Sequence, residues 1–286
     1  MSDAPDARTD AFERQRRRLF GIAYRMLSSV MEAEDIVQEA YLRYQTASLE
    51  AIREPDAYLT RIVTNLCLDR LKSAAAQREV YVGEWLPEPL PTPDDLTESE
   101  SETISMAFLL ILERLSPVER AVFLLHEVFD YSYAEIAVFV GKDEVACRQV
   151  LHRAKAHVMA QRPRYHAAPD AHQAILTKFV TAVTLGDMDG LLALLAEDAV
   201  GYSDGGGKVH ASPKPIVGAA IVARLLVSSR RLISPETTLE VRTINGTAAL
   251  ILRVGGAAQS VISLETDGAK IQVVRIVLNL DKLRHL

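Results

Sequence analysis

The chain has 286 residues, of which 49% are hydrophobic and 24% charged, and its formal net charge is −6. This length allows two or three domains, each with its own core. No run approaches about 18 apolar residues and no signal peptide is apparent, so membrane and secreted proteins are not expected. Cys67 and Cys147 have no partner at metal-ligand spacing, which favours buried thiols. We therefore predict a cytoplasmic protein without a membrane segment, a metal or a cofactor.

The negative charge is unevenly distributed along the sequence. Residues 84–102 contain seven carboxylates and no cation, whereas lysine and arginine cluster at 14–18, 61–78 and 148–164. Contact with nucleic acid depends on the local electrostatic potential and not on the net charge of the whole chain. The acidic total therefore does not exclude a DNA-binding protein.

Apolar residues at helical spacing predict consecutive helices over residues 10–82. Glu39 and Arg43 lie one turn apart on the polar side of the second helix, and we expect them to pair. The third helix is expected over 57–77. The pattern then stops, because residues 85–97 contain four prolines and many carboxylates. This composition predicts an extended linker that buries little surface.

The most informative motif is a pair of helices separated by a glycine. Ser132 and Glu135 have the spacing of a capping box, Gly141 suits the left-handed residue that ends a helix, and Asp143 can cap the next helix. Residues 116–119 (SPVE) give a similar start signal for the preceding helix. The order of these signals predicts a helix-turn-helix, a fold whose second helix contacts DNA.

The second helix of this pair concentrates positive charge on one side. No acidic residue occurs between 145 and 164, and contact with phosphates requires a helix face of one charge. An ordinary solvated surface helix is the alternative interpretation. The apolar positions expected to face the core are Val145, Val150, Leu151, Ala154 and Val158. The outward residues that could contact DNA are Arg148, Gln149, His152, Arg153 and Lys155.

The last part of the chain changes from helical to strand-like patterns. Two helices are expected between about residues 171 and 195, and the first should end at Gly186. The pairs Asn245-Gly246 and Asp267-Gly268 each separate two β-rich segments, which is the strongest short signal for a hairpin. We predict an α+β domain in which helices pack against an antiparallel sheet.

Three motifs in order relate the first part of the chain to a known family. Residues 32–43 (EAEDIVQEAYLR), residues 58–71 (YLTRIVTNLCLDRL) and the helix-turn-helix resemble those of bacterial extracytoplasmic-function sigma factors, also called group IV sigma factors. The resemblance covers about residues 10–163. It implies that the chain is an RNA polymerase sigma factor and not an enzyme.

The remaining third resembles a SnoaL-like domain, which has the cone-shaped NTF2-like fold. Residues 85–89 (WLPEP), 204–208 (DGGGK) and 279–283 (NLDKL) are similar to signatures of the sigma branch that carries this extension. Leu280 stands where that pattern usually has proline. The resemblance implies that the extension controls the sigma portion of the same chain.

The resemblance also implies a multidomain protein, with two all-α sigma domains followed by the α+β cone. Its partners would be core RNA polymerase and promoter DNA, both double-stranded and melted. The expected divisions are a disordered N-terminus at 1–9, sigma region 2 at 10–84, an acidic proline-rich linker at 85–103, sigma region 4 at 104–163 and the SnoaL-like domain at 168–286.

Residues matching the family motifs take the implied roles. Core polymerase binding is expected of Asp35, Gln38 and Glu39, and contact with the minus-ten element is expected of Arg61, Asn65, Arg70 and Lys72. At the minus-thirty-five element, Arg148 and Gln149 are expected to read bases, and Arg153 and Lys155 to contact phosphates, with His152 on the same helix.

We expect the extension to contact the linker or the first sigma domain within the same chain. The proposed regulatory interface consists of Trp85, Pro87, Asp204, Gly205, Gly206, Gly207, Asp281 and Lys282. Glycines at 205–207 would form a flexible loop that lets the backbone approach a neighbour.

Two other classes of function remain open at this point. An enzyme would use Asp198, Asp204 or His210 as a general base in the cone, although turn and cap chemistry explains these residues equally well. A repressor would sense a small ligand, so far unknown, through the cone. The helix that contains residues 35–43 argues against both classes, because neither needs a surface for docking to polymerase.

Overall fold

The computed structural model describes residues 7–48, 52, 54–78, 81, 83–94, 96–161, 167–230 and 234–286. Residues 1–6 of the terminus expected to be disordered lie outside this set, and residues 7–9 belong to the first helix. The chain forms two compact units. Unit 1 contains residues 1–79 and 108–162, and unit 2 contains residues 80–107 and 163–286. Within the described residues, no helix has the length and apolar character needed to span a membrane.

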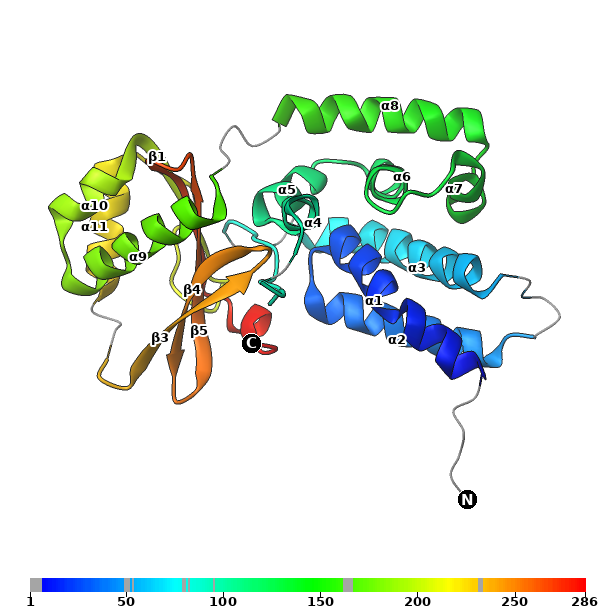
Figure 1. Ribbon diagram of the computed structural model, residues 1–286, viewed down its shortest axis with the longest axis horizontal. Helices are drawn as coiled ribbons and strands as arrows, with labels where there is room; N and C mark the ends of the chain where they lie inside the picture. The colour runs from blue at the N-terminus through cyan, green and yellow to red at the C-terminus, as the bar shows by residue number, and fades with distance from the viewer. Residues whose placement is uncertain are drawn as a thin grey trace, which may run out of the picture. The chain divides into compact units, whose positions relative to one another are not determined.

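Unit 1 begins with three packed helices, α1 (Ala7–Leu27), α2 (Val30–Thr46) and α3 (Pro55–Arg78) (Figure 1). Ser29 caps α2, because its side chain accepts a hydrogen bond from the backbone N–H of Glu32 at 3.2 Å. The expected pair within α2 is present, with 2.8 Å between Nε of Arg43 and Oε1 of Glu39. The core between the helices includes Leu19, Ile22, Val37, Leu59 and Val63.

Unit 1 also contains α5 (Met106–Leu112) from Phe108 onward, together with α6 (Pro117–Glu127), α7 (Tyr133–Val140) and α8 (Glu144–Gln161). The predicted signals are confirmed, since Ser116 and Ser132 both form capping boxes and Gly141 ends α7 with φ +67°. Oδ1 of Asp143 accepts a hydrogen bond from the N–H of Ala146 at 2.7 Å at the start of α8. Local hydrogen bonds therefore define the helix-turn-helix.

Unit 2 begins with the proline-rich segment, which differs from the sequence expectation in one respect. Its backbone is extended as predicted, but Leu86 is buried, so the segment packs against the rest of the unit instead of remaining solvated. A helix, α4 (Glu98–Ile104), also lies inside the expected linker. A capping box between Thr97 and Glu100 starts α4, a signal that was present in the sequence and was overlooked.

The rest of unit 2 has helices on one side of a six-stranded sheet (Figure 1). The strand order is β2-β1-β6-β5-β4-β3. The elements are α9 (Pro169–Leu185), α10 (Met188–Leu194), β1 (Leu195–Asp204), β2 (Ile216–Val217), α11 (Ala219–Ser229), β3 (Thr237–Ile244), β4 (Thr247–Val254), β5 (Ala257–Thr266), β6 (Ile271–Val277) and the 3-10 helix η3 (Leu280–Leu283).

The two hairpins predicted from the sequence are confirmed, β3–β4 at Asn245-Gly246 and β5–β6 at Asp267-Gly268. The expectation of a wholly antiparallel sheet is wrong, because β1 pairs with β6 in parallel. After β1 and the short edge strand β2, the chain crosses by α11 to the opposite edge at β3 and returns through three hairpins, β3–β4, β4–β5 and β5–β6. After this crossover β6 runs in the same direction as β1.

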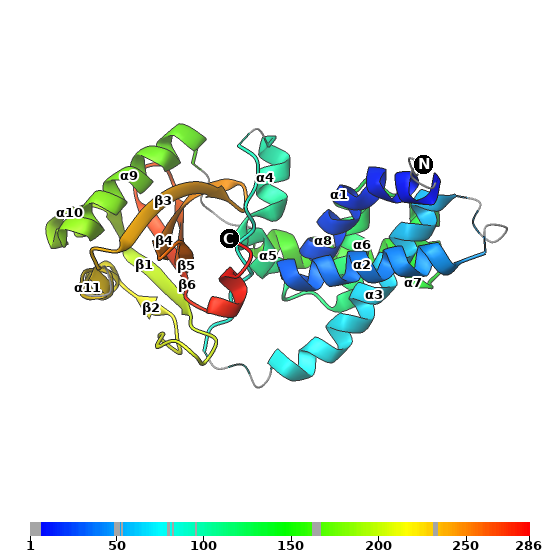
Figure 2. The same ribbon diagram turned by 90° about the horizontal axis from the view of Figure 1, so that it is seen from below.

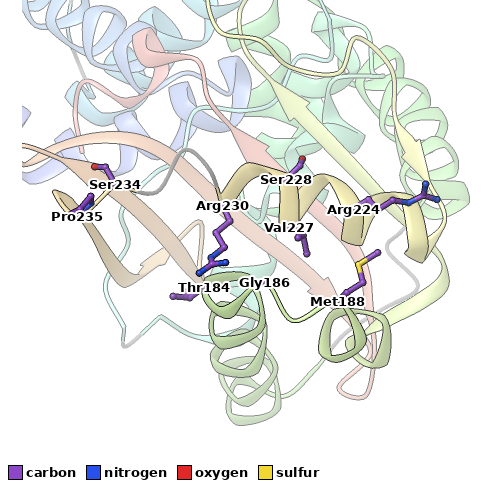
Figure 3. A pocket seen from close by; sticks show the side chains of 9 residues that line it. All are labelled: Thr184, Gly186, Met188, Arg224, Val227, Ser228, Arg230, Ser234 and Pro235. Atoms are coloured by element: carbon purple, nitrogen blue, oxygen red, sulfur yellow. The ribbon is translucent and has the colours of Figure 1, made fainter.

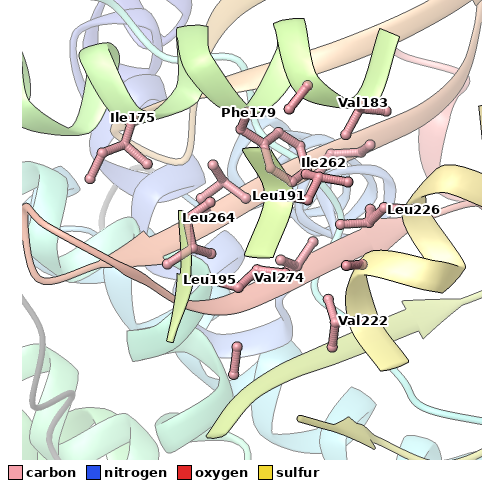
Figure 4. Close-up of a cluster of buried hydrophobic side chains, with 14 of the residues drawn as sticks. Ile175, Phe179, Val183, Leu191, Leu195, Val222, Leu226, Ile262, Leu264 and Val274 are labelled. Carbon is pink, nitrogen blue, oxygen red and sulfur yellow. The ribbon is translucent and has the colours of Figure 1, made fainter. Parts of the chain in front are cut away.

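The core of unit 2 lies between the sheet and helices α9, α10 and α11 (Figure 4). Phe179, Leu191 and Val222 from the helices meet Leu264 and Val274 from the sheet, and all five are almost fully buried. The side chains of this cluster are aliphatic or aromatic, so the helix-facing side of the sheet is filled with hydrocarbon. Leu86 and Met106 make their contacts with Asp204 and Ser263 on the opposite face.

Candidate functional site

Helix α2 presents an exposed stripe that contains two of the predicted residues. Met31, Asp35, Gln38 and Leu42 are all exposed, and their spacing of four, three and four residues places them on one face. The exposed fractions of Met31 and Leu42 are 44% and 55%. Large apolar side chains at both ends of a polar stripe are typical of a protein-binding surface. Met31 and Leu42 were missed in the sequence because apolar periodicity assigns such residues to the core.

Helix α3 brings three of its four predicted residues onto one exposed face. Arg61, Asn65 and Lys72 are solvent-exposed at near-helical spacing, and Nζ of Lys72 lies 3.0 Å from Oδ1 of Asp69 on the same helix. Arg70 lies off this face, since its Nε is 3.2 Å from Oε1 of Glu32 in α2. The candidate track along α3 therefore contains fewer free cations than the sequence indicated.

Two contacts within the protein hold the side chain of Arg148 in α8. Its guanidinium donates to Oε2 of Glu144 at 2.8 Å and lies 5.1 Å from the ring centroid of Tyr133 in α7. Gln149 and His152 are exposed on the same side. Val145 is also there with 60% of its surface exposed, so the expectation that it faces the core is wrong. The helix begins at Glu144, and its first turn extends beyond the packed part of the motif.

The two predicted phosphate-binding residues of α8 already have acidic neighbours on α6. Nζ of Lys155 lies 2.8 Å from Oε2 of Glu127, and Nε of Arg153 lies 4.0 Å from Oε1 of Glu119. Burial alone would raise the pKa of Glu127, but hydrogen bonds from Lys155 and His126 lower it below its ordinary value. Both cations remain about half exposed and can still reach a phosphate.

A buried arginine joins the first three helices of unit 1 to the last four. Arg120 in α6 is 2% exposed, and its Nη1 donates to the carbonyl of Met26 at 2.6 Å and to Oε1 of Glu113 at 2.9 Å. The same carboxylate oxygen accepts from the hydroxyl of Ser28 at 2.9 Å. Burial lowers the pKa of Arg120 to about 10, still far above neutral pH, so the guanidinium stays charged. A second contact pairs the hydroxyls of Thr60 and Tyr131 at 2.9 Å.

In unit 2, Asp204 is the centre of a buried polar network at the end of β1. The residue is 0% exposed, and its carboxylate accepts from the backbone N–H of Leu86 at 2.9 Å and from the hydroxyl of Tyr81 at 2.5 Å. Nζ of Lys282 donates to Oδ2 at 2.8 Å, and the N–H of Gly206 donates to Oδ1 at 3.0 Å. Four donors from three parts of the chain satisfy a single carboxylate.

Lys282 completes this network and ties it to the proline-rich segment. Its ammonium donates to the carbonyl of Leu86 at 2.5 Å and lies 4.2 Å from the ring centroid of Trp85. Burial and the hydrogen bond to Asp204 raise the pKa of Tyr81, so its hydroxyl remains a donor. The turn after the 3-10 helix adds a contact, in which Nε2 of His285 lies 2.6 Å from the carbonyl oxygen of Pro89. Leu86 and Pro89 are thus bound by residues at the C-terminal end of the chain.

The glycines at 205–207 form a tight turn and not a flexible loop. A Cβ on Gly205 would lie 2.1 Å from the carbonyl oxygen of Val209, and one on Gly206 would lie 2.3 Å from Nδ2 of Asn279. Gly206 and Gly207 both have positive φ, at +60° and +72°. Gly205 is therefore required for space, Gly207 for its backbone conformation and Gly206 for both.

The remaining predicted interface residues lie around the same network. Lys208 pairs with Asp281, whose other oxygen is 2.5 Å from Nη2 of Arg284. Pro87 is buried within the bound segment, and Leu280 is half exposed. The structure therefore brings the three sequence signatures of the extension, WLPEP, DGGGK and NLDKL, into one place within unit 2.

Comparison with known proteins decides the family. Residues 11–77 match Sigma-70 region 2, and residues 105–158 match Sigma-70, region 4. The chain is 38% identical over 222 residues to the ECF RNA polymerase sigma factor SigJ of Mycobacterium tuberculosis, covering 76% of this chain and 71% of SigJ. The chain belongs to the extracytoplasmic-function sigma factors.

Similarity to other sigma factors extends over nearly the whole chain, both in sequence and in structure. A probable ECF RNA polymerase sigma factor, SigI of M. tuberculosis, is 31% identical over 96% of this chain and 95% of its own. The crystal structure of M. tuberculosis SigJ matches 96% of this chain and 97% of that chain, with 32% identity and a TM-score of 0.73. The C-terminal α+β part is similar to smaller NTF2-like proteins, including one from Burkholderia xenovorans LB400 with 19% identity over 38% of this chain and 84% of that one, at a TM-score of 0.29.

The residues considered for catalysis in this sigma factor do not form a buried acid–base site. Asp198 and His210 are exposed, and the carboxylate of Asp204 is paired with Lys282. A cavity of about 920 Å³ lies beside α9, α10 and α11, where Met188, Arg224 and Ser228 contribute to its wall (Figure 3). The described residues that line it include no carboxylate, histidine or thiol. Among the described residues, no cluster of three metal-ligating side chains is present.

Proposed function

We propose that this sigma factor binds core RNA polymerase in the cytoplasm, recognises minus-ten and minus-thirty-five promoter elements and initiates transcription. The observation that carries core binding is the exposed stripe on α2, in which Met31 and Leu42 flank Asp35 and Gln38. Glu39 lies beside the stripe and pairs with Arg43, so we assign it a supporting role. Exposed apolar side chains next to polar ones can bury surface against a protein partner and form specific hydrogen bonds there.

Substitution within the stripe tests this assignment. Leu42→Asp places a charge where an apolar contact is proposed, and we expect association with core polymerase to weaken by roughly tenfold or more. Leu192→Asp changes an exposed leucine of α10 and is the matched control. Binding of the full chain to core polymerase is measured by fluorescence anisotropy. Equal affinity of the two variants would show that polymerase docks elsewhere.

For the minus-ten element we propose the exposed face of α3. Arg61 and Lys72 provide the positive charge that follows a phosphate backbone, and the amide of Asn65 can hydrogen-bond the edge of an unstacked base. Arg70 then acts indirectly, because its ion pair with Glu32 joins α3 to α2. This division separates the residues that touch DNA from the residue that supports the helix carrying them.

For the minus-thirty-five element we propose the first two turns of α8. Arg148 and Gln149 are the types of side chain that read guanine and adenine edges in the major groove. Exposed Val145 lies on the same face and supplies an apolar surface of the kind that contacts a thymine methyl group. His152, Arg153 and Lys155 follow one to two turns later, where the helix runs along the backbone.

We infer that the C-terminal domain regulates the sigma regions through the linker and does not catalyse a reaction. The linker joins region 2 to region 4, and Asp204 and Lys282 bind its first part. A general base needs an unpaired carboxylate or imidazole within a cavity, which Asp204 does not provide. A domain that holds the connection between two DNA-binding regions can restrict how these regions reach their promoter elements.

The test removes the buried charges without leaving one of them unpaired. In the double variant Asp204→Asn with Lys282→Met, we expect run-off transcription at a matched promoter to change severalfold, since two charged hydrogen bonds of about 1.5–3 kcal/mol each are lost. Asp198→Asn with Lys178→Met makes the same changes at exposed positions. Circular dichroism and core binding verify the fold. Unchanged transcription at equal abundance would refute regulation through this network.

A further inference from the structure

The tip of the β3–β4 hairpin is buried, which is unusual for a two-residue turn. Hairpin turns normally lie in solvent, where water satisfies their polar groups. Asn245 at this tip is only 1% exposed, and it has a left-handed backbone with φ +51°. Figure 2 shows α4 beside the end of this hairpin. The burial therefore comes from the linker and not from the sheet itself.

Asn245 binds Leu90 in the linker and Ile104 at the end of α4, which are far apart in sequence. Its Oδ1 accepts from the N–H of Leu90 at 3.0 Å, and its Nδ2 donates to the carbonyl of Ile104 at 2.8 Å. Its own backbone N–H donates to the carbonyl of Leu90 at 2.8 Å. Buried backbone groups need such partners, because an unpaired one costs free energy. One side chain thus joins the beginning and the end of segment 90–104.

Neighbouring residues extend this contact on both sides of the turn. Pro91 forms a β-bridge with Ile244, and the N–H of Gly246 donates to the hydroxyl of Thr92 at 3.0 Å. A Cβ on Gly246 would lie 2.7 Å from the Cα of Ser101, so α4 packs directly on the glycine. The sequence Asn-Gly was interpreted as a turn signal alone. The structure shows that the same pair also forms a binding surface for the linker.

Asparagine is the residue type that this position requires. The side chain must both donate and accept while the backbone adopts a left-handed conformation, which asparagine tolerates better than most residues. Aspartate would keep the acceptor for Leu90 but would lose the donor to Ile104. Glycine would keep the backbone conformation and the backbone hydrogen bond but would lose both side-chain bonds.

We infer that Asn245 is a positioning residue for promoter recognition, which sets the usable length of the linker between regions 2 and 4. The inference rests on the proposed regulation through the linker, but concerns a second attachment, separate from the one at Asp204. An extended segment 90–104 could span roughly 48 Å. Because Asn245 holds both ends of this segment, the segment cannot extend to that length. Because each base pair adds about 3.4 Å of helix axis, a restrained linker favours one promoter spacer length.

The experiment uses the full chain with core polymerase. Run-off transcription is measured on templates whose spacers between the two promoter elements differ by single base pairs. We expect Asn245→Gly to broaden this spacer profile, with activity at unfavourable spacers rising about threefold relative to the best spacer, as expected when hydrogen bonds of about 1 kcal/mol are removed. Asn245→Asp should broaden the profile at least as much, because a buried carboxylate oxygen would face the carbonyl of Ile104 without a donor. Asp267→Ala alters the other hairpin turn, whose hydrogen bonds to Ala269, Lys270 and Gln272 are local, and is the control.

Hydrogen exchange at the Leu90 amide reports directly whether the attachment has been lost. Faster exchange in Asn245→Gly together with an unchanged spacer profile would overturn the inference. If the Asp204→Asn, Lys282→Met variant alters transcription while both Asn245 variants keep the wild-type profile, only the role of Asn245 fails. If neither attachment affects transcription, the proposed regulation fails with it. If Asn245→Gly does not fold, the profile of Asn245→Asp decides the question by the same criterion.

Discussion

Each unit of this sigma factor contains a buried cation that joins segments distant in sequence, but the two environments differ. In unit 2, Lys282 contacts a carboxylate, a carbonyl and the ring of Trp85, and Asp204 accepts from four donors. In unit 1, Arg120 contacts Glu113 and one carbonyl, and among the described residues its Nε has no hydrogen-bond partner. The attachment of the linker is therefore more completely satisfied than the contact between regions 2 and 4.

This difference has a physical consequence for the two attachments. Burying a charge is costly unless good geometry and additional hydrogen bonds compensate for the lost water. Incomplete pairing of Arg120 lowers the free energy needed to separate the two sigma regions, because water can solvate the guanidinium after they part. Exposing the network at Asp204 to water gains less free energy of solvation, since the carboxylate already accepts hydrogen bonds from four donors in the folded chain. We expect unit 2 to hold the linker more firmly than regions 2 and 4 hold each other.

We expect the largest effect from removing Asp204, the carboxylate at the centre of the unit 2 network. Asp204→Ala leaves the ammonium of Lys282 buried without its carboxylate and should lower the free energy of unfolding of unit 2 by about 4 kcal/mol. Urea unfolding followed by the fluorescence of Trp85, the single tryptophan, measures this loss. Asp198→Ala removes an exposed carboxylate from the same strand and should change little. A loss similar to that of Asp198→Ala would contradict the importance of the network.

Removing the corresponding cation of unit 1 should have a somewhat smaller effect. We expect Arg120→Ala to lower the free energy of unfolding by about 3 kcal/mol, because the buried hydrogen bonds from its guanidinium to the carbonyl of Met26 and the carboxylate of Glu113 are lost. The double variant Arg120→Met with Glu113→Gln should recover part of the loss, since both members of the ion pair are then neutral. Exposed Arg114→Ala serves as the control, and circular dichroism in urea is the measurement. A loss greater than that of Asp204→Ala would reverse the comparison.

DNA recognition should depend on unit 1 and divide between two residues of α8. Arg148→Ala is expected to reduce discrimination at one base pair of the minus-thirty-five element by about 1–3 kcal/mol. Lys155→Ala should weaken binding to all sequences alike and by less, because Glu127 already holds Lys155 at 2.8 Å. Titrations against a set of promoter variants distinguish the two patterns. A uniform loss for both variants would refute the assigned roles.

The smallest expected effect is a pH dependence confined to unit 2. His172 in α9 is buried, with Nε2 3.2 Å from the carbonyl of Leu264, and burial lowers the pKa of His172 below its ordinary value of 6.5. The unfolded chain therefore takes up a proton before the folded chain does. Stability is fully present above about pH 6.5 and falls on acidification, by less than about 1.4 kcal/mol per pH unit, the limit for one proton.

Melting curves followed by Trp85 fluorescence between pH 7.5 and about 5.5 test this effect. His172→Gln should reduce the acid-dependent part of the change, whereas exposed His210→Gln should leave it intact. An identical pH dependence in the wild type and both variants would assign the acid sensitivity to other groups. Comparison with circular dichroism of the whole chain shows whether unit 1 shares the response.

Structural features with local causes were predictable from the sequence. The capping boxes at Ser116 and Ser132, the left-handed end of α7 at Gly141 and both hairpins are set by residues within three or four positions of one another. The capping box at Thr97 is equally local, and only the expectation of an unstructured linker hid it. Local signals of this kind are satisfied before the chain packs.

Predictions for the candidate site were less accurate where the position of a side chain depends on residues distant in sequence. Val145 continues an apolar pattern, but it lies in the first turn of α8 with 60% of its surface exposed. Arg70 was expected to line the α3 track, yet Glu32 from another helix pairs with it. Spacing along a helix gives the face of a residue, but not what packs against that face.

The sequence by itself determined the elements, the family motifs and the residue types available for contact with polymerase and DNA. Only the tertiary structure decided which charges pair between distant segments and which atoms bind the linker. The partners of Asp204 include Leu86 and Lys282, and Asn245 binds Leu90 and Ile104, in each case across more than seventy positions of sequence. Such pairings follow from burial in a common core, where a polar group must find a partner wherever the fold supplies one.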